Sequence, residues 1–160
     1  TVGCWVRADA WASPTPRIIS RATGADWFER RWEVALINTR KVRFTLRLKD
    51  TVYELYGQTP FLLGEWYFVV VTFDNVLRQM RVYVNGEPDG VFKNTVDEIV
   101  NDDDQIAAWI GDCPITPNQR PWAGPIDEVF IMQDVALTSE QIKELYELRI
   151  PNVKVISWDD

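Results

Sequence analysis

Apolar and polar residues alternate most regularly between Val42 and Lys49. Every second residue there is apolar and the residues between them are polar or charged: Val42, Phe44, Leu46 and Leu48 against Arg43, Thr45, Arg47 and Lys49. Successive side chains of a β-strand point to opposite faces of its sheet. The segment is therefore predicted to be a strand with one face in a core and the other in water.

Further alternating or apolar runs, bounded by turn residues, follow along the chain. They predict strands at residues 2–7, 17–20, 32–38, 52–56, 66–73, 80–84, 107–111, 126–133 and 153–158. Residues 66–73 are the most apolar run and are expected to be covered on both faces. Asn85-Gly86 is a strong signal for a two-residue hairpin turn. About a dozen short strands favour an all-β sandwich over a barrel or an α/β sheet.

One short helix is predicted near the end of the chain, over Ser139–Arg149. Thr138 is placed as its N-cap, and Gln141 follows three residues later as in a capping box. Leu137 and Ile142 are spaced as a hydrophobic staple across the helix start. Pro151 ends the helical stretch.

Composition narrows the class of protein. With 160 residues, 46% of them hydrophobic, the chain is long enough for one domain with a substantial core. The net charge of −7 argues against nucleic acid or an anionic membrane as the main partner. No apolar run reaches the length of a membrane span, and Thr1 does not open a signal peptide. We expect the chain to be a piece of a larger protein.

Histidine is absent from the sequence, which removes Ser-His and Cys-His nucleophile pairs, histidine metal sites and the usual general base. The two cysteines, Cys4 and Cys113, are too few for a disulfide framework. Either they pair with each other or both are buried free thiols.

Two stretches carry a resemblance to a known family. The first runs from Gly124 through Ile126-Asp127-Glu128-Val129 and an Ala-Leu pair into the helix start. The second is Gly64-x-Trp66 followed by a strand and by the hairpin at 81–86. Both are similar to laminin G-like, concanavalin A-like lectin/glucanase superfamily domains. The resemblance implies a two-sheet antiparallel jelly-roll sandwich with one short C-terminal helix, formed by residues 1–160 as a single domain that lacks the family's first strand.

The resemblance also implies a structural calcium ion at Asp127, with Gly124 at the start of the same motif. Because Ca²⁺ takes six to eight oxygen ligands, Asp127 alone would not make a site. Asp127 can instead accept hydrogen bonds from backbone amides at a strand edge. The acidic residues 102–104 are a second place for a calcium ion or simply a solvated loop.

Catalysis is not expected. Laminarinase-type enzymes of the superfamily carry a Glu-x-Asp-x-x-Glu strand with three carboxylates on one face. The nearest match here begins Glu87-x-Asp89, but Phe92 stands where the last glutamate belongs. Asp127 and Glu128 have no partner glutamate at the required spacing.

The eight tryptophans supply the ligand candidates. An exposed indole in a loop can stack on a sugar ring. Four tryptophans are predicted in or beside loops: Trp11, Trp27, Trp32 and Trp122. The last three are the ligand-binding candidates. Trp5, Trp66 and Trp109 lie within predicted strands and are expected in the core. The family resemblance implies a non-catalytic, extracellular or cell-surface recognition or adhesion module, with a glycan or an extracellular protein as partner. The alternative is a structural spacer.

The absent first strand raises a further hypothesis. In the family this strand pairs near the C-terminal strand, here residues 153–158. A peptide or a neighbouring copy of the chain can supply it by strand addition. Alternatively, residues 153–158 close the sheet and the first strand is dispensable.

Overall fold

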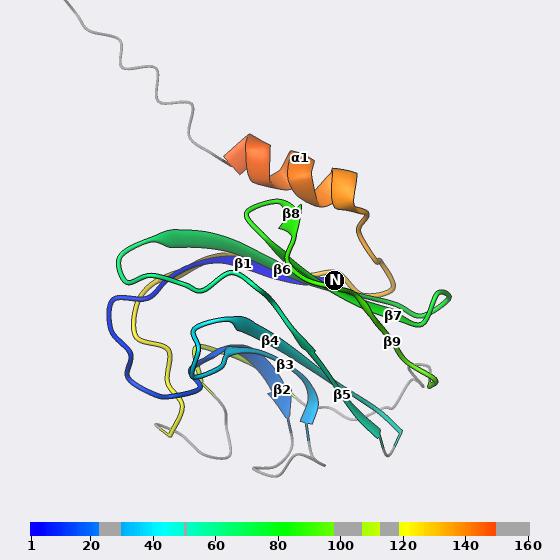
Figure 1. Cartoon of the computed structure of the whole chain (residues 1–160), viewed down its shortest axis with the longest axis horizontal. Helices are drawn as coiled ribbons and strands as arrows, with labels where there is room; N and C mark the ends of the chain where they lie inside the picture. Colours follow the sequence, from blue (N-terminus) through cyan, green and yellow to red (C-terminus); the bar gives the residue numbers. More distant parts are fainter. Residues whose placement is uncertain (23–29, 50, 98–106, 113–118, 150–160) are drawn as a thin grey trace, which may run out of the picture.

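The computed structural model describes residues 1–22, 30–49, 51–97, 107–112 and 119–149. In this part of the chain there are eleven strands and one helix (Figure 1). They are β1 (Val2–Arg7), β2 (Arg17–Ala22), β3 (Arg30–Leu36), β4 (Val42–Leu48), β5 (Thr51–Tyr56), β6 (Trp66–Asp74), β7 (Gln79–Val84), β8 (Glu87–Pro88), β9 (Lys93–Asn94), β10 (Ala108–Ile110), β11 (Ile126–Ile131) and α1 (Ser139–Arg149).

The strands form two sheets that face each other. The six-stranded sheet has the order β11-β1-β6-β7-β8, with β9 also paired to β7, and the five-stranded sheet has the order β10-β2-β3-β4-β5. All of these pairs are antiparallel. The predicted fold class, an all-β two-sheet sandwich with one short helix, is confirmed. The extent of the domain, residues 1–160, stays a prediction, since residues 150–160 lie outside the described part.

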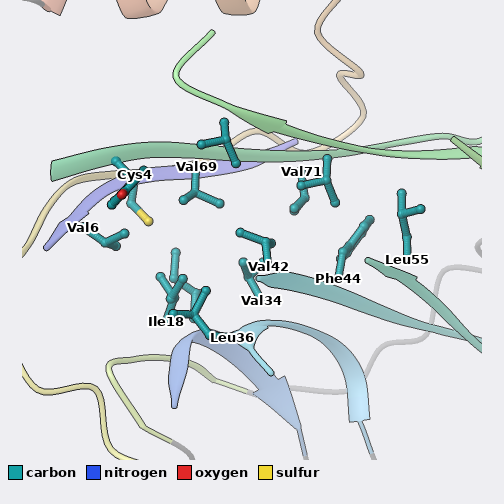
Figure 2. Packing of buried hydrophobic residues seen from close by; sticks show 14 of the residues in the cluster. Cys4, Val6, Ile18, Val34, Leu36, Val42, Phe44, Leu55, Val69 and Val71 are labelled. Carbon is teal, nitrogen blue, oxygen red and sulfur yellow. The ribbon is translucent and has the colours of Figure 1, made fainter. Parts of the chain in front are cut away.

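The main core lies between the sheets, where the apolar sets of the alternating strands meet. Figure 2 shows Cys4, Val6, Val69 and Val71 of the six-stranded sheet facing residues of the other sheet, namely Ile18, Val34, Leu36, Val42, Phe44 and Leu55. Each large apolar side chain buried in this way contributes about 1.5–3 kcal/mol. Cys4 is a buried free thiol, and burial raises its pKa to about 12. Because Cys4 is free, the alternative in which it pairs with Cys113 is not found in this structure, and the surroundings of Cys113 lie outside the described residues.

A second, smaller core lies on the outer face of the six-stranded sheet, beneath α1 (Figure 1). Phe68 and Val70 of β6 pack there against Ile142 of the helix. Their neighbours Val69 and Val71 face the main core. The prediction that this strand is covered on both faces is therefore confirmed.

The predicted helix start is also confirmed. The backbone N–H of Thr138 donates to Oε1 of Gln141 over 2.9 Å, and the backbone N–H of Gln141 donates to Oγ1 of Thr138 over 3.3 Å. These two bonds are the reciprocal pair of a capping box, which satisfies amides that the first helical turn leaves open. Leu137 and Ile142 join the smaller core. The helix is consequently fixed in place at its first turn.

The Asn85-Gly86 turn joins β7 to β8 as predicted. Both residues have positive φ angles, 53° and 83°, which is what a type I′ hairpin turn requires. Oδ1 of Asn85 also accepts a 2.9 Å hydrogen bond from the backbone of Phe68. The turn is thereby tied to the strand beneath α1.

Candidate functional site

The candidate site is the face of the five-stranded sheet that points away from the core, here called the polar face. Strand register places Ser20, Glu33, Thr45 and Glu54 in one row across β2, β3, β4 and β5. A neighbouring row contains Arg17, Ala35, Arg43 and Tyr56. Trp109 of β10 lies opposite Ser20 and extends the first row to the edge of the sheet.

Buried ion pairs form the centre of the polar face. Nε of Arg17 donates to Oε2 of Glu33 over 2.6 Å, and Nη2 of Arg43 donates to Oε1 of the same carboxylate over 2.5 Å. Glu33 has no exposed surface, and both arginines are buried. Charges removed from water persist only when they are paired and hydrogen-bonded. Glu33 therefore fixes two guanidinium groups from two other strands.

The network continues toward the β5 edge. Nη1 of Arg43 lies 3.7 Å from Oε1 of Glu54, and the Tyr56 hydroxyl donates a 2.6 Å hydrogen bond to Oε2 of Glu54. Burial, with the hydrogen bond to Glu54 adding to it, raises the pKa of Tyr56. The tyrosine hydroxyl is therefore a neutral donor at physiological pH. Two cations and two anions, Arg17, Arg43, Glu33 and Glu54, make this network neutral in formal charge.

Exposed aromatic rings stand at two edges of the polar face. Trp109 on β10 is 42% exposed and Tyr56 on β5 is 41% exposed. Oγ1 of Thr45 and Oε1 of Glu54, between them in the rows, have no hydrogen-bond partner within the described part of the chain. These two oxygens are buried, whereas the exposed rings of Trp109 and Tyr56 offer apolar faces, which suit the C–H faces of sugars.

The structure places some of the tryptophans differently from the sequence-based prediction. Trp122 is only 9% exposed and packs in the main core, so the expectation of an exposed loop indole is wrong for this residue. Its backbone N–H donates to the carbonyl of Gly111, which draws residues 119–123 against the sandwich. Trp32 lies within β3 and packs partly buried against the main core instead of standing beside a loop. Trp27 lies outside the described residues.

Two tryptophans that we expected in the core are exposed. Trp66 is 40% exposed at the start of β6, where the Arg7 guanidinium lies 5.5 Å from the ring centroid, and Trp109 points outward from an edge strand. Trp5 packs as expected, 5.6 Å from the ring of Tyr146 in the smaller core. Trp11 is half-buried, with Arg40 over its ring at 4.3 Å. Sequence reasoning missed Trp109 and Tyr56 because nothing local shows that β10 and β5 are edge strands.

The calcium candidates lie on and beside β11. Asp127 is exposed, and its Oδ1 accepts a 2.8 Å hydrogen bond from the backbone of Glu128. Gly124 has a φ of +145°, and a Cβ there would stand 2.0 Å from the Arg7 carbonyl oxygen. No group of three or more acidic, cysteine or histidine side chains that could hold a metal occurs among the described residues. The described residues thus supply fewer than three such side chains around Asp127, which do not by themselves fit Ca²⁺. The acidic stretch 102–104 lies outside them.

The residues of the incomplete glucanase pattern have other partners. Asp89 is buried and accepts three hydrogen bonds, from the backbones of Gln58 and Thr59 and from the Thr59 hydroxyl, at 2.7–3.0 Å. Glu87 pairs with Lys143 of α1 at 2.8 Å. Asp89 thus holds the β5–β6 loop, and Glu87 anchors the helix.

Comparison with known proteins agrees with this architecture. The family model described as "Concanavalin A-like lectin/glucanases superfamily" matches residues 1–143, and the chain belongs to this family. No curated protein sequence matches it.

Solved structures with the same fold share little sequence with the chain. The CBM40 module of the Ruminococcus gnavus IT-sialidase, bound to α2,3-sialyllactose, has a TM-score of 0.72 at 15% identity, over 91% of this chain and 80% of the module. A Bacteroides ovatus protein assigned provisionally to carbohydrate binding has a TM-score of 0.69 at 18% identity, over 89% of this chain and 39% of that protein. A pentraxin of Limulus polyphemus has a TM-score of 0.63 at 20% identity, over 91% of this chain and 68% of the pentraxin. The chain therefore spans about two fifths of the Bacteroides protein. At these identities the likeness shows the fold alone.

No helix within the described residues is long and apolar enough to span a membrane.

Proposed function

We propose that this chain is a non-catalytic glycan-binding module whose ligand lies on the polar face. The observation that carries the proposal is the placement of two exposed rings, Trp109 and Tyr56, on opposite edge strands of the polar face. The carbohydrate-binding descriptions of several structural relatives support the class of ligand. Because the charged network is neutral, stacking and hydrogen bonds would dominate binding over net charge.

The test is binding of the purified chain to an array of neutral and sialylated glycans, followed by titration of the best ligand. The variant carrying both Tyr56→Ala and Trp109→Ala is expected to lose at least tenfold in affinity, which is about 1.4 kcal/mol or more. Trp66→Ala is the matched control, since Trp66 is equally exposed but lies on the other sheet. Equal losses in both variants, or no array signal at all, would contradict the proposal.

A structural calcium ion beside Asp127 is part of the same proposal. Since the described residues supply fewer than three acidic side chains there, the remaining ligands would come from elsewhere in the protein or from water. Calcium bound only to the folded state would raise the free energy of unfolding by mass action, by a few kcal/mol at concentrations far above Kd. The melting temperature would rise with it. EDTA is expected to lower the melting temperature of the chain, and Asp127→Asn to abolish that difference. An unchanged melting curve would show that Asp127 only bonds its neighbour's backbone.

We also propose that the module works outside the cell or at its surface, as part of a larger protein.

A second candidate function is that of a split or spacer domain completed by an added strand. The arrangement at β11 favours it: this strand is at the end of its sheet and, within the described part, pairs only with β1. Residues 153–158, the alternative partner for this edge, lie outside the described residues.

A further inference from the structure

The β11 edge of the six-stranded sheet, which has no further strand among the described residues, lies beside an apolar groove. The groove has a volume of about 230 Å³ and lies between β11 and α1. It is lined by Phe68, Val129, Phe130, Met132 and Leu145, with Glu128 as its charged residue. Sites for drug-sized ligands span roughly 300–1,000 Å³, so this groove is too small for one of them and suits a single large side chain.

The backbone next to the groove has groups directed away from its own sheet. The Met132 N–H donates to the Thr1 carbonyl and the Thr1 amino group donates to the Met132 carbonyl, at 2.9 and 3.0 Å. In an antiparallel ladder such bonded pairs alternate with non-bonded pairs, so Ile131, which lies opposite Val2, directs its N–H and C=O away from β1. Ile131 is also 52% exposed.

A bulge limits where a new strand can pair. The register of β1 with β11 shifts between Gly3 and Trp5, and Glu128 there has a φ of +50°. Its N–H is bonded to the Asp127 side chain. Bulges of this kind protect edge strands from pairing. Regular pairing is thus confined to the stretch around Ile131, which is the stretch that borders the groove.

Charge indicates what kind of strand would fit. From Asp127 to Ile142 the sequence contains four acidic residues, Asp127, Glu128, Asp134 and Glu140, and no basic residue. Lys143, the next basic residue, is paired with Glu87 on the far side of the helix. A partner with lysine or arginine beside its apolar residues would be electrostatically complementary to this edge.

We propose that the edge of β11 and its groove bind an extended segment of another polypeptide, with aliphatic residues in the middle and basic residues on both sides. This inference deepens the second candidate function above. The residue opposite Ile131 bonds to its N–H and C=O and packs on its side chain. The next residue of the segment points to the opposite face and enters the groove beside Phe130, Met132 and Leu145.

The experiment uses the full chain and a fluorescent peptide, Lys-Lys-Val-Ile-Val-Lys-Lys, with binding followed by anisotropy. Ile131→Pro removes the outward N–H but no bond to β1, and proline is tolerated on an edge strand when its missing N–H faces outward. This variant is expected to weaken binding at least tenfold, as is Met132→Asp in the groove. Leu62→Ala, an exposed apolar change at another loop, is expected to leave affinity within twofold. Melting curves confirm that each variant is folded.

Peptide controls separate the contributions. Replacing the central Val-Ile-Val by Val-Pro-Val, or all lysines by glutamates, is expected to reduce binding at least tenfold. Absence of peptide binding, or equal binding by the chain and Ile131→Pro, would overturn the proposal. Slow hydrogen exchange at the Ile131 amide in the free chain would also overturn the proposal. If the exchange rate did not depend on protein concentration, residues 150–160 would be the segment that covers the edge. If it did depend on concentration, a second copy of the chain would cover it. Glycan affinity is measured on the same variants and is expected to be unchanged, so failure of either proposal is recognised separately.

Discussion

Replacing Glu33 with glutamine is expected to lower the free energy of unfolding by about 3–5 kcal/mol. The change keeps the size of the side chain but removes the carboxylate that both Arg17 and Arg43 contact in the interior of the polar face. Glu33 is fully buried, so solvent cannot compensate the two guanidinium groups. For a domain of this size the expected fall in melting temperature is roughly 6–20 °C.

Thermal or urea unfolding of the purified variant measures this effect. Glu65→Gln is the matched control, because Glu65 is exposed in the β5–β6 loop and the same substitution there should change stability by less than about 0.5 kcal/mol. A Glu33→Gln variant as stable as the control would mean that the two arginines are neutralised without Glu33.

Replacing Gly124 with alanine is expected to destabilise the chain by roughly 2–6 kcal/mol, the sum of overpacking and backbone strain. The added Cβ would meet the Arg7 carbonyl oxygen at 2.0 Å and the Asp9 nitrogen at 3.0 Å. Because these are backbone atoms, no flexible side chain can move aside to relieve the clash. The neighbouring bonds from Arg7 to Pro125 and from Asp9 to Ala123, at 3.1 and 2.8 Å, would have to lengthen or break.

Gly64→Ala separates the clash from the backbone strain. Gly64 also has a positive φ, +79°, but no atom lies within 4 Å of the position of its Cβ. Its alanine variant is expected to lose only about 1 kcal/mol. Both variants are melted with and without EDTA. A Gly124→Ala effect that vanishes in EDTA would assign this glycine to the calcium site, whereas an effect of equal size in both conditions would assign it to chain packing.

Strands, turn and helix were predictable because their signals are local. The alternation at residues 42–49 requires only that a strand have two faces, and β4 has the predicted apolar face in the core. Thr138 and Gln141 can be recognised as a capping box because they lie three residues apart, and the helix begins where that spacing predicts. The family resemblance added the two-sheet arrangement of these elements.

The surface and the candidate site were decided by tertiary structure. Trp66 and Trp109 lie within predicted strands and Trp122 lies beside a predicted loop, yet the first two are exposed and the third is buried, because exposure depends on which strands are at a sheet edge and which loops fold back. Likewise, nothing local joins Arg17 to Glu33 or Glu33 to Arg43. Only the register of β2, β3 and β4 brings the three charges together, and register is set by long-range packing of the opposite, apolar face. The sequence by itself therefore determined the elements and their inner faces, whereas the tertiary structure alone decided what the outer faces present.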